Sequence, residues 1–160
     1  MADPISTEPQ SQGDPYLAFQ VSKGEIFAFA ATSVREVILQ PADSITPMPN
    51  VAKQVLGMFN LRGRVIWVGD LAQLLGLPSQ FRSDRPEVPL LAIEHGNVLM
   101  AVMIDQLGGM VWLNRQELQP ISGPAKLQTF CRGERPATET GRAIRVLDPT
   151  VILNPQHWSL

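Results

Sequence analysis

The segment Val55–Leu77, VLGMFNLRGRVIWVGDLAQLLGL, constrains the fold more than any other part of the chain. Two runs of apolar and β-branched residues, one ending at Leu61 and the next beginning at Val65, flank an Arg-Gly pair that is typical of a tight turn. Asp70 follows the second run and precedes a stripe of leucines, the pattern of an N-cap and a short helix. The segment therefore predicts a strand, a turn, a second strand and a capped helix.

Arg62 is the candidate functional residue of this segment. It lies in the predicted turn, where a charge has no role in a core and where a partner protein can reach it. The alternative is a solvated hairpin tip made by Arg62 and Arg64 on either side of Gly63. Trp67 lies among the valines of the second strand, where core packing is favoured over an exposed binding position.

The composition is that of a single globular domain. A chain of 160 residues with 44% hydrophobic and 18% charged residues buries a substantial core. The net charge of −2 and a pI near 5.6 argue against a protein that coats nucleic acid. There is neither a signal-peptide pattern nor an apolar run approaching the roughly 18 residues that span a bilayer, so we expect a cytoplasmic protein.

Outside the opening segment, short apolar runs separated by turn residues predict a chain of strands. We expect strands at residues 16–21, 26–30, 34–39, 88–94, 97–105, 110–113, 127–132 and 143–147. The run at 34–39, VREVIL, also fits a helical turn. Many short strands at such spacing favour small barrels or a sandwich.

The remaining segments are assigned from their caps and breakers. Asn50 is expected to cap a short helix that runs through Val55 and ends at Gly57, and Asp148 to cap another helix near the end of the chain. Tails and connections are expected at residues 1–14 (a disordered tail), 79–89 (a connection between lobes), 132–142 (a charged loop) and 156–160 (a C-terminal tail).

No set of residues in the sequence has the pattern of an active site or a metal site. His95, in a predicted turn, and His157 have no partner at ligand spacing. Cys131 is the only cysteine. It is expected to be a buried strand residue rather than a nucleophile, because no supporting His and Asn accompany it. We therefore expect no enzymatic activity, no cofactor and no bound metal.

The carboxylates and arginines outside the Arg62 turn also favour structural roles. Asp70 and Asp148 are expected to cap helices rather than to transfer protons. Asp105 precedes a Gly-Gly bend, where a structural hydrogen bond is favoured and an interface role comes second. A mixed-charge, solvated loop is the expected setting of the second group of basic residues, Arg132, Arg135, Arg142 and Arg145.

The chain resembles the CheW family, the coupling proteins of bacterial chemosensory arrays. Its strongest match is LGMFNLRGRVIWVGDLAQLLG, residues 56–76. Four further stretches follow the family order: YLAFQVSKGEIFAFAATSVREVI, ITPMPNVAKQVLG, LLAIEHGNVLMAVMIDQL and AIRVLDPTVIL. The chain departs from the family pattern at Trp67, where proline is usual, at Gly69, where a hydrophobic residue is usual, and in the loop 132–142.

The resemblance implies a mostly β fold with two small five-stranded SH3-like β barrels packed together and short helices, forming one domain over residues 15–155. It implies a non-enzymatic adaptor that bridges the cytoplasmic tip of chemoreceptors to the regulatory domain of a histidine kinase. Such a protein reaches the membrane only through the receptors. The alternative is a small β-barrel module that binds nucleic acid or another protein, against which the acidic pI and the single tyrosine count.

The resemblance also implies the binding residues. Arg62 matches the family's turn arginine, so the partner-binding role is carried to it, and Asn60 and Gly63 are expected to shape its turn. Four further candidates are expected to lie at strand edges near the same turn: Val34, Val37, Leu56 and Met58.

Overall fold

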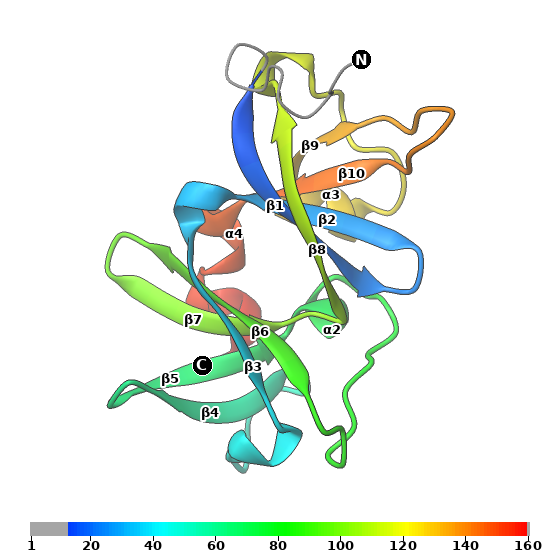
Figure 1. The fold of residues 1–160 in the computed structure, drawn as a ribbon. Coiled ribbons are helices and arrows are strands. Elements are labelled where there is room, and N and C mark those ends of the chain that lie inside the picture. The colour runs from blue at the N-terminus through cyan, green and yellow to red at the C-terminus, as the bar shows by residue number, and fades with distance from the viewer. Residues whose placement is uncertain (1–12, 160) are drawn as a thin grey trace.

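The computed structural model describes residues 13–159, and its strands form two five-stranded sheets (Figure 1). The predicted disordered tail, residues 1–14, lies outside the described residues except for its last two positions, and the first strand begins at Asp14. No helix among residues 13–159 is long and apolar enough to cross a membrane.

The first sheet has the strand order β8-β1-β2-β10-β9. Its strands are β1 (Asp14–Ser22), β2 (Glu25–Ala30), β8 (Gln106–Leu113), β9 (Cys131–Arg135) and β10 (Ile144–Leu147). The second sheet has the order β3-β6-β7-β5-β4. Its strands are β3 (Val34–Gln40), β4 (Val55–Leu61), β5 (Arg64–Asp70), β6 (Val88–His95) and β7 (Val98–Met103). The predicted mostly β fold with two five-stranded lobes is confirmed.

The two lobes repeat one topology. In each sheet an edge strand pairs with an antiparallel hairpin, which pairs in parallel with a second antiparallel pair. The chain enters the first lobe with β1 and β2, builds the second lobe from β3 to β7, and returns with β8. It crosses between the lobes at the 3₁₀ turn η1 (Ala31–Ser33) and at the two residues between β7 and β8. The first lobe is thus completed by a segment distant in the sequence, whereas the second lobe is continuous.

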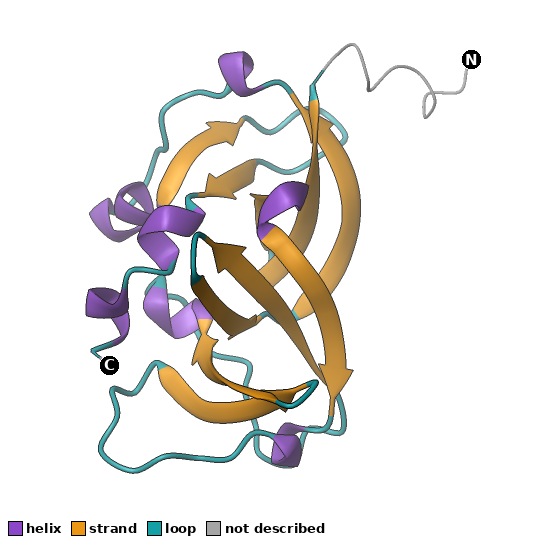
Figure 2. Cartoon of the chain, turned by 90° about the vertical axis from the view of Figure 1, so that its left-hand side faces the viewer, coloured by secondary structure: helices purple, strands orange, loops and turns teal. Residues whose placement is uncertain are grey.

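The helices are short and several gather along the side where the C-terminus lies (Figure 2). They are α2 (Leu71–Leu74), α3 (Ala125–Phe130) and α4 (Pro149–Ile152), with the 3₁₀ turns η1, η2 (Ala42–Ser44), η3 (Arg115–Glu117) and η4 (Pro155–Trp158). The predicted caps Asp70 and Asp148 are confirmed. Asp70 accepts a hydrogen bond from the Gln73 amide at 3.4 Å, and Asp148 accepts one from the Thr150 amide at 3.0 Å.

The largest hydrophobic cluster joins the lobes. Phe19 and Phe29 of the first sheet stack with their ring centroids 5.7 Å apart, and the same cluster includes Leu91 and Ile93 of the second sheet. Helices α2 and α4 add residues to it. A separate cluster lies inside each lobe. Because residues of both sheets form the central cluster, burial of its apolar side chains holds the two lobes together.

The expected helix between Asn50 and Gly57 is wrong. The described chain has turns there, and Val55 already begins strand β4. Gly57 has a φ of 148°, and a Cβ atom at that position would overlap the carbonyl oxygen of Thr46. Thr46 forms a two-hydrogen-bond bridge with Met58. The glycine is therefore required by the close approach of another chain segment and does not end a helix.

The expected strand at 127–132 is also wrong. Residues Ala125–Phe130 form helix α3, and the strand begins only at Cys131. Leu127 and Phe130 are both buried, and their spacing of three residues places them on one helical face. The expected charged loop is shortened in consequence, because its first four residues belong to β9.

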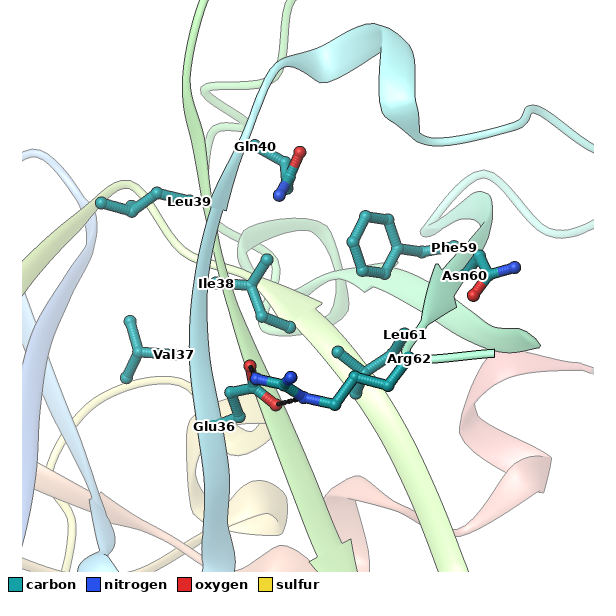
Figure 3. A pocket seen from close by; sticks show the side chains of 9 residues that line it. All are labelled: Glu36, Val37, Ile38, Leu39, Gln40, Phe59, Asn60, Leu61 and Arg62. Atoms are coloured by element: carbon teal, nitrogen blue, oxygen red, sulfur yellow. Dashed lines mark hydrogen bonds and ion pairs between the residues drawn. The ribbon is translucent and has the colours of Figure 1, made fainter. Parts of the chain in front are cut away.

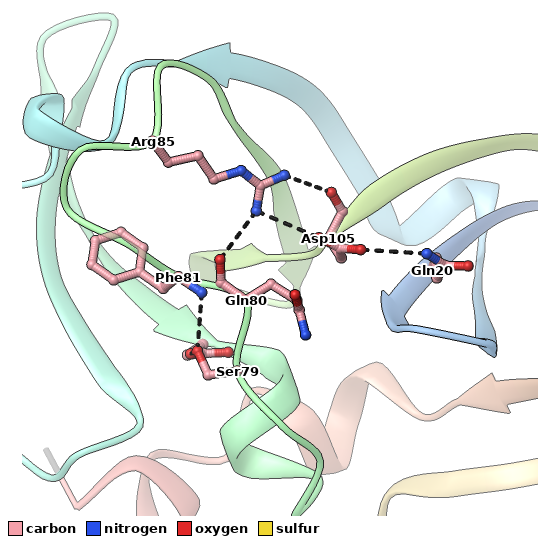
Figure 4. Close-up of polar contacts among 7 residues, drawn as sticks. Gln20, Ser79, Gln80, Phe81, Arg85 and Asp105 are labelled. Atoms are coloured by element: carbon pink, nitrogen blue, oxygen red, sulfur yellow. Dashed lines mark hydrogen bonds and ion pairs between the residues drawn. The ribbon is translucent and has the colours of Figure 1, made fainter.

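Residues 79–89 do not connect the lobes. They lead from α2 into β6, and β5 and β6 belong to the same sheet. Arg85 holds this segment against the lobe crossing, because its Nη2 donates a hydrogen bond to the carbonyl oxygen of Asp105 at 2.8 Å (Figure 4). The Asp105 carboxylate accepts a bond from Gln20 Nε2 at 3.3 Å. Asp105 thus takes the structural role that the sequence favours.

The C-terminal segment is packed rather than a tail over its described part. Trp158 is fully buried, and its indole Nε1 donates a hydrogen bond to the carbonyl oxygen of Ile152 at 2.8 Å. The Trp158 ring occupies the space beside Gly69, where a Cβ atom would overlap it. Gln54 Nε2 also donates a bond to the His157 carbonyl oxygen at 2.7 Å. The chain end therefore fastens onto β5 of the second lobe.

Candidate functional site

A groove lies between the two edge strands of the second sheet. Strands β3 and β4 occur at opposite ends of the strand order, so the sheet leaves a seam where they approach each other. The seam contains a cavity of about 340 Å³, open to the surface (Figure 3). Its lining consists of two short runs, one from each side: Glu36, Val37, Ile38, Leu39 and Gln40 from β3, and Phe59, Asn60, Leu61 and Arg62 from β4 and its turn.

The turn after β4 fixes the position of Arg62. Arg62 and Gly63 form a two-residue connection with φ values of 54° and 87°, as a type I′ hairpin turn requires. The Asn60 side-chain oxygen accepts a hydrogen bond from the Gly63 amide at 2.8 Å and stabilises the turn. The predicted shaping role of Asn60 and Gly63 agrees with this geometry.

Arg62 spans the mouth of the groove. Its Nε lies 3.2 Å from Glu36 Oε1 and its Nη2 lies 2.7 Å from Glu36 Oε2, a bidentate contact between β4's turn and β3. The hydrogen bond from Arg62 lowers the pKa of the Glu36 carboxyl, and the same bond raises the pKa of Arg62. The Arg62 side chain remains 76% exposed. The pair therefore contributes little to stability but holds an accessible guanidinium in one orientation.

Strand β3 presents two different faces. Ile38 turns toward the groove and packs in the second-lobe core with Phe59, and both are nearly buried. Val37 and Leu39 point away from Phe59 and Arg62 (Figure 3) and are 38% and 51% exposed. Neighbouring exposed aliphatic side chains on an edge strand form an apolar surface that another molecule can cover. β3 thus offers a polar, arginine-capped groove on one side and an apolar face on the other.

The structure brings together only part of the predicted site. Arg62 and Asn60 line the groove, and Gly63 adjoins it in the turn. Val37 belongs to the strand that lines the groove, but its side chain points to the other face. The other three candidates lie outside its lining: Val34, which packs half-buried on the central core, Leu56, which packs on the second-lobe core, and Met58, which pairs with Trp67 and bridges Thr46.

Glu36 is the residue that sequence reasoning missed. It lies 26 positions before Arg62, and no local pattern joins the two. The alternation of side chains along β3 could have indicated Glu36, because it places Glu36 on the same face of the strand as Ile38. The Glu36 carboxylate lines the groove and holds the side chain of Arg62 in place.

The comparison with known families identifies the fold. The model of the family described as the CheW-like domain matches residues 15–156. The chain belongs to the CheW family. Members of this family are non-enzymatic scaffolding adaptors, and the lobes described above are their two SH3-like subdomains.

Individual CheW-family proteins are similar over most of the chain. The chemotaxis protein CheW of Bacillus subtilis is 22% identical over 90% of this chain and 89% of its own length. Protein PilI of Pseudomonas aeruginosa is 31% identical over 69% of this chain and 61% of its own length. The crystal structure of the scaffolding protein TtCheW from Thermoanaerobacter tengcongensis superposes with a TM-score of 0.70 at 19% identity, covering 86% of this chain and 90% of that one. That likeness confirms the fold.

The reactive side chains of this CheW-family chain are not arranged for chemistry. Burial raises the pKa of the Cys131 thiol to about 12, so the thiolate that a nucleophile requires is scarce at neutral pH. His157 packs its ring edge-on against Phe130, with centroids 4.8 Å apart. Within residues 13–159, no group of three or more His, Cys, Asp or Glu residues is placed to hold a metal ion.

Proposed function

We propose that this chain is a cytoplasmic adaptor that couples the tip of chemoreceptors to the regulatory domain of a histidine kinase. It would act in an array serving chemotaxis, twitching or phototaxis. Membership of the CheW family supports the proposal, as do relatives named as chemotaxis proteins. The observation that carries it is the Arg62 turn, because an exposed guanidinium held by a bidentate ion pair at the mouth of a groove suits partner binding.

The groove between β3 and β4 is the proposed contact for the kinase. The family resemblance implies a regulatory domain with the same fold, so the contact would pair one barrel from each protein. Arg62, Asn60 and Gly63 are the proposed contact residues in the groove, while the side chain of Val37 points away from it and belongs to the face proposed for the receptor below. Val34, Leu56 and Met58 are half-buried, and we assign them to support of the two strands.

The apolar face of β3 is the proposed approach for the receptor. A receptor tip is a helical hairpin, and a helix docks by laying an apolar stripe along a hydrophobic surface. Val37 and Leu39 supply such a surface on the side of β3 that faces away from the groove. Two partners could then occupy opposite faces of a single strand.

The proposed mechanism requires geometry rather than chemistry. An adaptor that holds receptor and kinase in fixed positions lets a small receptor movement change kinase activity, with a coupling free energy shared between the two contacts. Each contact can be weak alone and still persist in an array, because neighbouring contacts raise the effective concentration.

A pull-down with the purified chain from lysate of the source organism tests the proposal. We expect the wild type to recover a histidine kinase and a receptor, and Arg62→Ala to bind the kinase about 30-fold more weakly, as the loss of an interface hot spot does. Arg82→Ala is the matched control, since Arg82 is also an exposed arginine, 71% accessible and paired with Asp84, but lies in another loop.

The melting temperatures of the two variants separate binding from folding. Both arginines form exposed ion pairs, so both variants should melt close to the wild type. A fall of many degrees for Arg62→Ala alone would show that Arg62 is structural. Recovery of nucleic acid or a metabolic enzyme without a kinase would contradict the adaptor function while leaving the fold intact.

A further inference from the structure

A second cavity opens on the first lobe, where the turn between β6 and β7 approaches it. The cavity has a volume of about 430 Å³, within the range of small-ligand sites. An adjoining cavity of about 400 Å³ shares Tyr16, Arg115 and Arg132 with it. The residues that line the first cavity and carry charge or a polar group are Asp14, Tyr16, Thr32, Ser33, His95, Arg115 and Arg132. The Arg62 groove has none of these residues in its lining.

Tyr16 is the buried polar side chain of this cavity. Only 1% of the residue is exposed, and its ring packs in the first-lobe core with Ala28 and Val146. Among residues 13–159 its hydroxyl forms no hydrogen bond to the protein, although it lines both cavities. The hydroxyl is not one of the fully enclosed polar atoms, so it is open to the cavity rather than sealed in the core. Within the described residues its donor is available to a molecule that enters the cavity.

Two guanidinium groups accompany the phenol. Burial raises the pKa of Tyr16, and the positive charges of Arg115 and Arg132 oppose that rise, so both charges act on the hydroxyl. Arg115 has no carboxylate within ion-pair distance among the described residues. Arg132 reaches one, Asp148 Oδ1, at 3.4 Å. As far as residues 13–159 show, the cavity therefore joins an arginine without an ion pair, Arg115, and an arginine with one long ion pair, Arg132, to an open hydroxyl.

We infer that this cavity binds a carboxylate, held by the Tyr16 hydroxyl and the guanidinium groups of Arg115 and Arg132. Guanidinium forks match the two oxygens of a carboxylate, and a phenol completes the set of donors. A phosphate monoester would match the same donors. It carries nearly two negative charges, however, and would meet the nearby carboxylates of Asp14 and Asp148. The two guanidinium groups and the two nearby carboxylates together therefore favour a ligand with a single negative charge.

The carboxylate can belong to an acidic side chain of a protein or to a free small acid. Both present the same oxygens to the three donors, and the cavity volume admits either. The inference does not rest on the adaptor function, because its evidence comes from the first lobe and its test requires neither kinase nor receptor.

The single tyrosine makes the test specific. Tyr16 is the only tyrosine in the chain, so ring-labelled tyrosine gives one set of NMR signals that reports on this cavity alone. The full-length protein is titrated with a blocked tetraglutamate peptide, with succinate, with inorganic phosphate, and with a blocked tetraglutamine peptide as the uncharged control. We expect saturable shifts of the Tyr16 signals with a carboxylate probe at millimolar concentrations or below.

Variants then assign the donors. Arg115→Gln and Arg132→Gln should each weaken binding about tenfold or more, because each removes a charge-assisted hydrogen bond. Tyr16→Phe keeps the buried ring and loses the hydroxyl, and its affinity is measured by calorimetry. Arg82→Gln is the control and should bind as the wild type does. Melting temperatures confirm that each variant is folded.

The outcomes separate the sources and can refute the site. Saturation by the peptide alone indicates an acidic protein segment, whereas equal or tighter binding of succinate indicates a free acid. Three results would overturn the inference: no saturable shift with any carboxylate, a shift with phosphate alone, or carboxylate binding that survives both arginine substitutions unchanged.

Discussion

Replacing Trp158 with alanine tests whether the C-terminal segment fastens the lobes together. The indole is fully buried, packs in the central cluster and donates a hydrogen bond to Ile152. A buried tryptophan removes about 150–250 Å² from water, which at about 25 cal/mol per Å² corresponds to about 4–6 kcal/mol. Measured Trp→Ala losses of about 3–5 kcal/mol are consistent with that figure. We therefore expect the free energy of unfolding to fall by about 4 kcal/mol.

Chemical denaturation and thermal melting measure this loss. For a domain of this size each kcal/mol moves the melting temperature by about 2–4 °C, so the expected fall is about 8–16 °C. Trp112→Ala is the matched control, because Trp112 is 44% exposed on β8 and its removal should cost less than about 1 kcal/mol. Equal, small losses in the two variants would refute the packing of the C-terminal segment.

Gly69 provides a second, independent check of the same contact. An alanine Cβ there would overlap the Trp158 ring and lie 2.8 Å from Met100 Cε. Gly69→Ala should cost about 1–3 kcal/mol by overpacking. In the Trp158→Ala background much of that cost should vanish, since the added methyl group enters the vacated space. Additive losses in this double-mutant cycle would show that the two positions do not touch.

Two further predictions concern titrating groups. Arg62→Ala should return the lowered pKa of the Glu36 carboxyl toward its ordinary value in an NMR titration. In the wild type the pairing is complete above that ordinary value and is lost as the pH falls through the lowered one, and an unchanged Glu36 pKa would contradict the ion pair. Cys131, with a thiol pKa raised from 9.0 to about 12, should react with a thiol reagent roughly 30-fold more slowly in the folded than in the unfolded chain, because the scarcity of thiolate is partly offset by its greater nucleophilicity; equal rates would contradict the raised pKa.

The parts predictable from sequence are those that depend on near neighbours. The Asn60 side chain accepts a hydrogen bond from the Gly63 amide, and the Asp70 side chain accepts one from the Gln73 amide. Each bond joins residues three positions apart, so the hairpin and its capped helix follow from local residues. The family resemblance then supplied the arrangement of lobes, which no periodicity in the strands specifies. Arg62 was found because a charge in a tight turn has no local structural purpose.

The parts that could not be predicted depend on residues distant in the chain. In the sequence Gly57 resembles the end of a helix, but in the fold the Thr46 carbonyl group occupies the space beside it. Gly69 and Trp158 are 89 positions apart, and neither indicates the other in the sequence. Leu127 and Phe130 lie on one face of a helix but would lie on opposite faces of a strand, and in so short a run only packing decides for the helix. In each case tertiary contact outweighed the local pattern.

The position of the Arg62 groove follows from the way both lobes protect their edges. A five-stranded sheet leaves two unpaired edges, which invite unwanted pairing. In the second lobe Thr46, beyond β3, folds back and bridges Met58 on β4; in the first lobe Gln119, beyond β8, bridges Glu134 on β9. These bridges cover one part of each seam. In the second lobe, the part of the seam nearest the β4–β5 turn is crossed by the exposed Arg62–Glu36 ion pair, which costs little to rearrange. That is the stretch of edge where a partner barrel would displace the least structure, and it is where the sequence places its turn arginine.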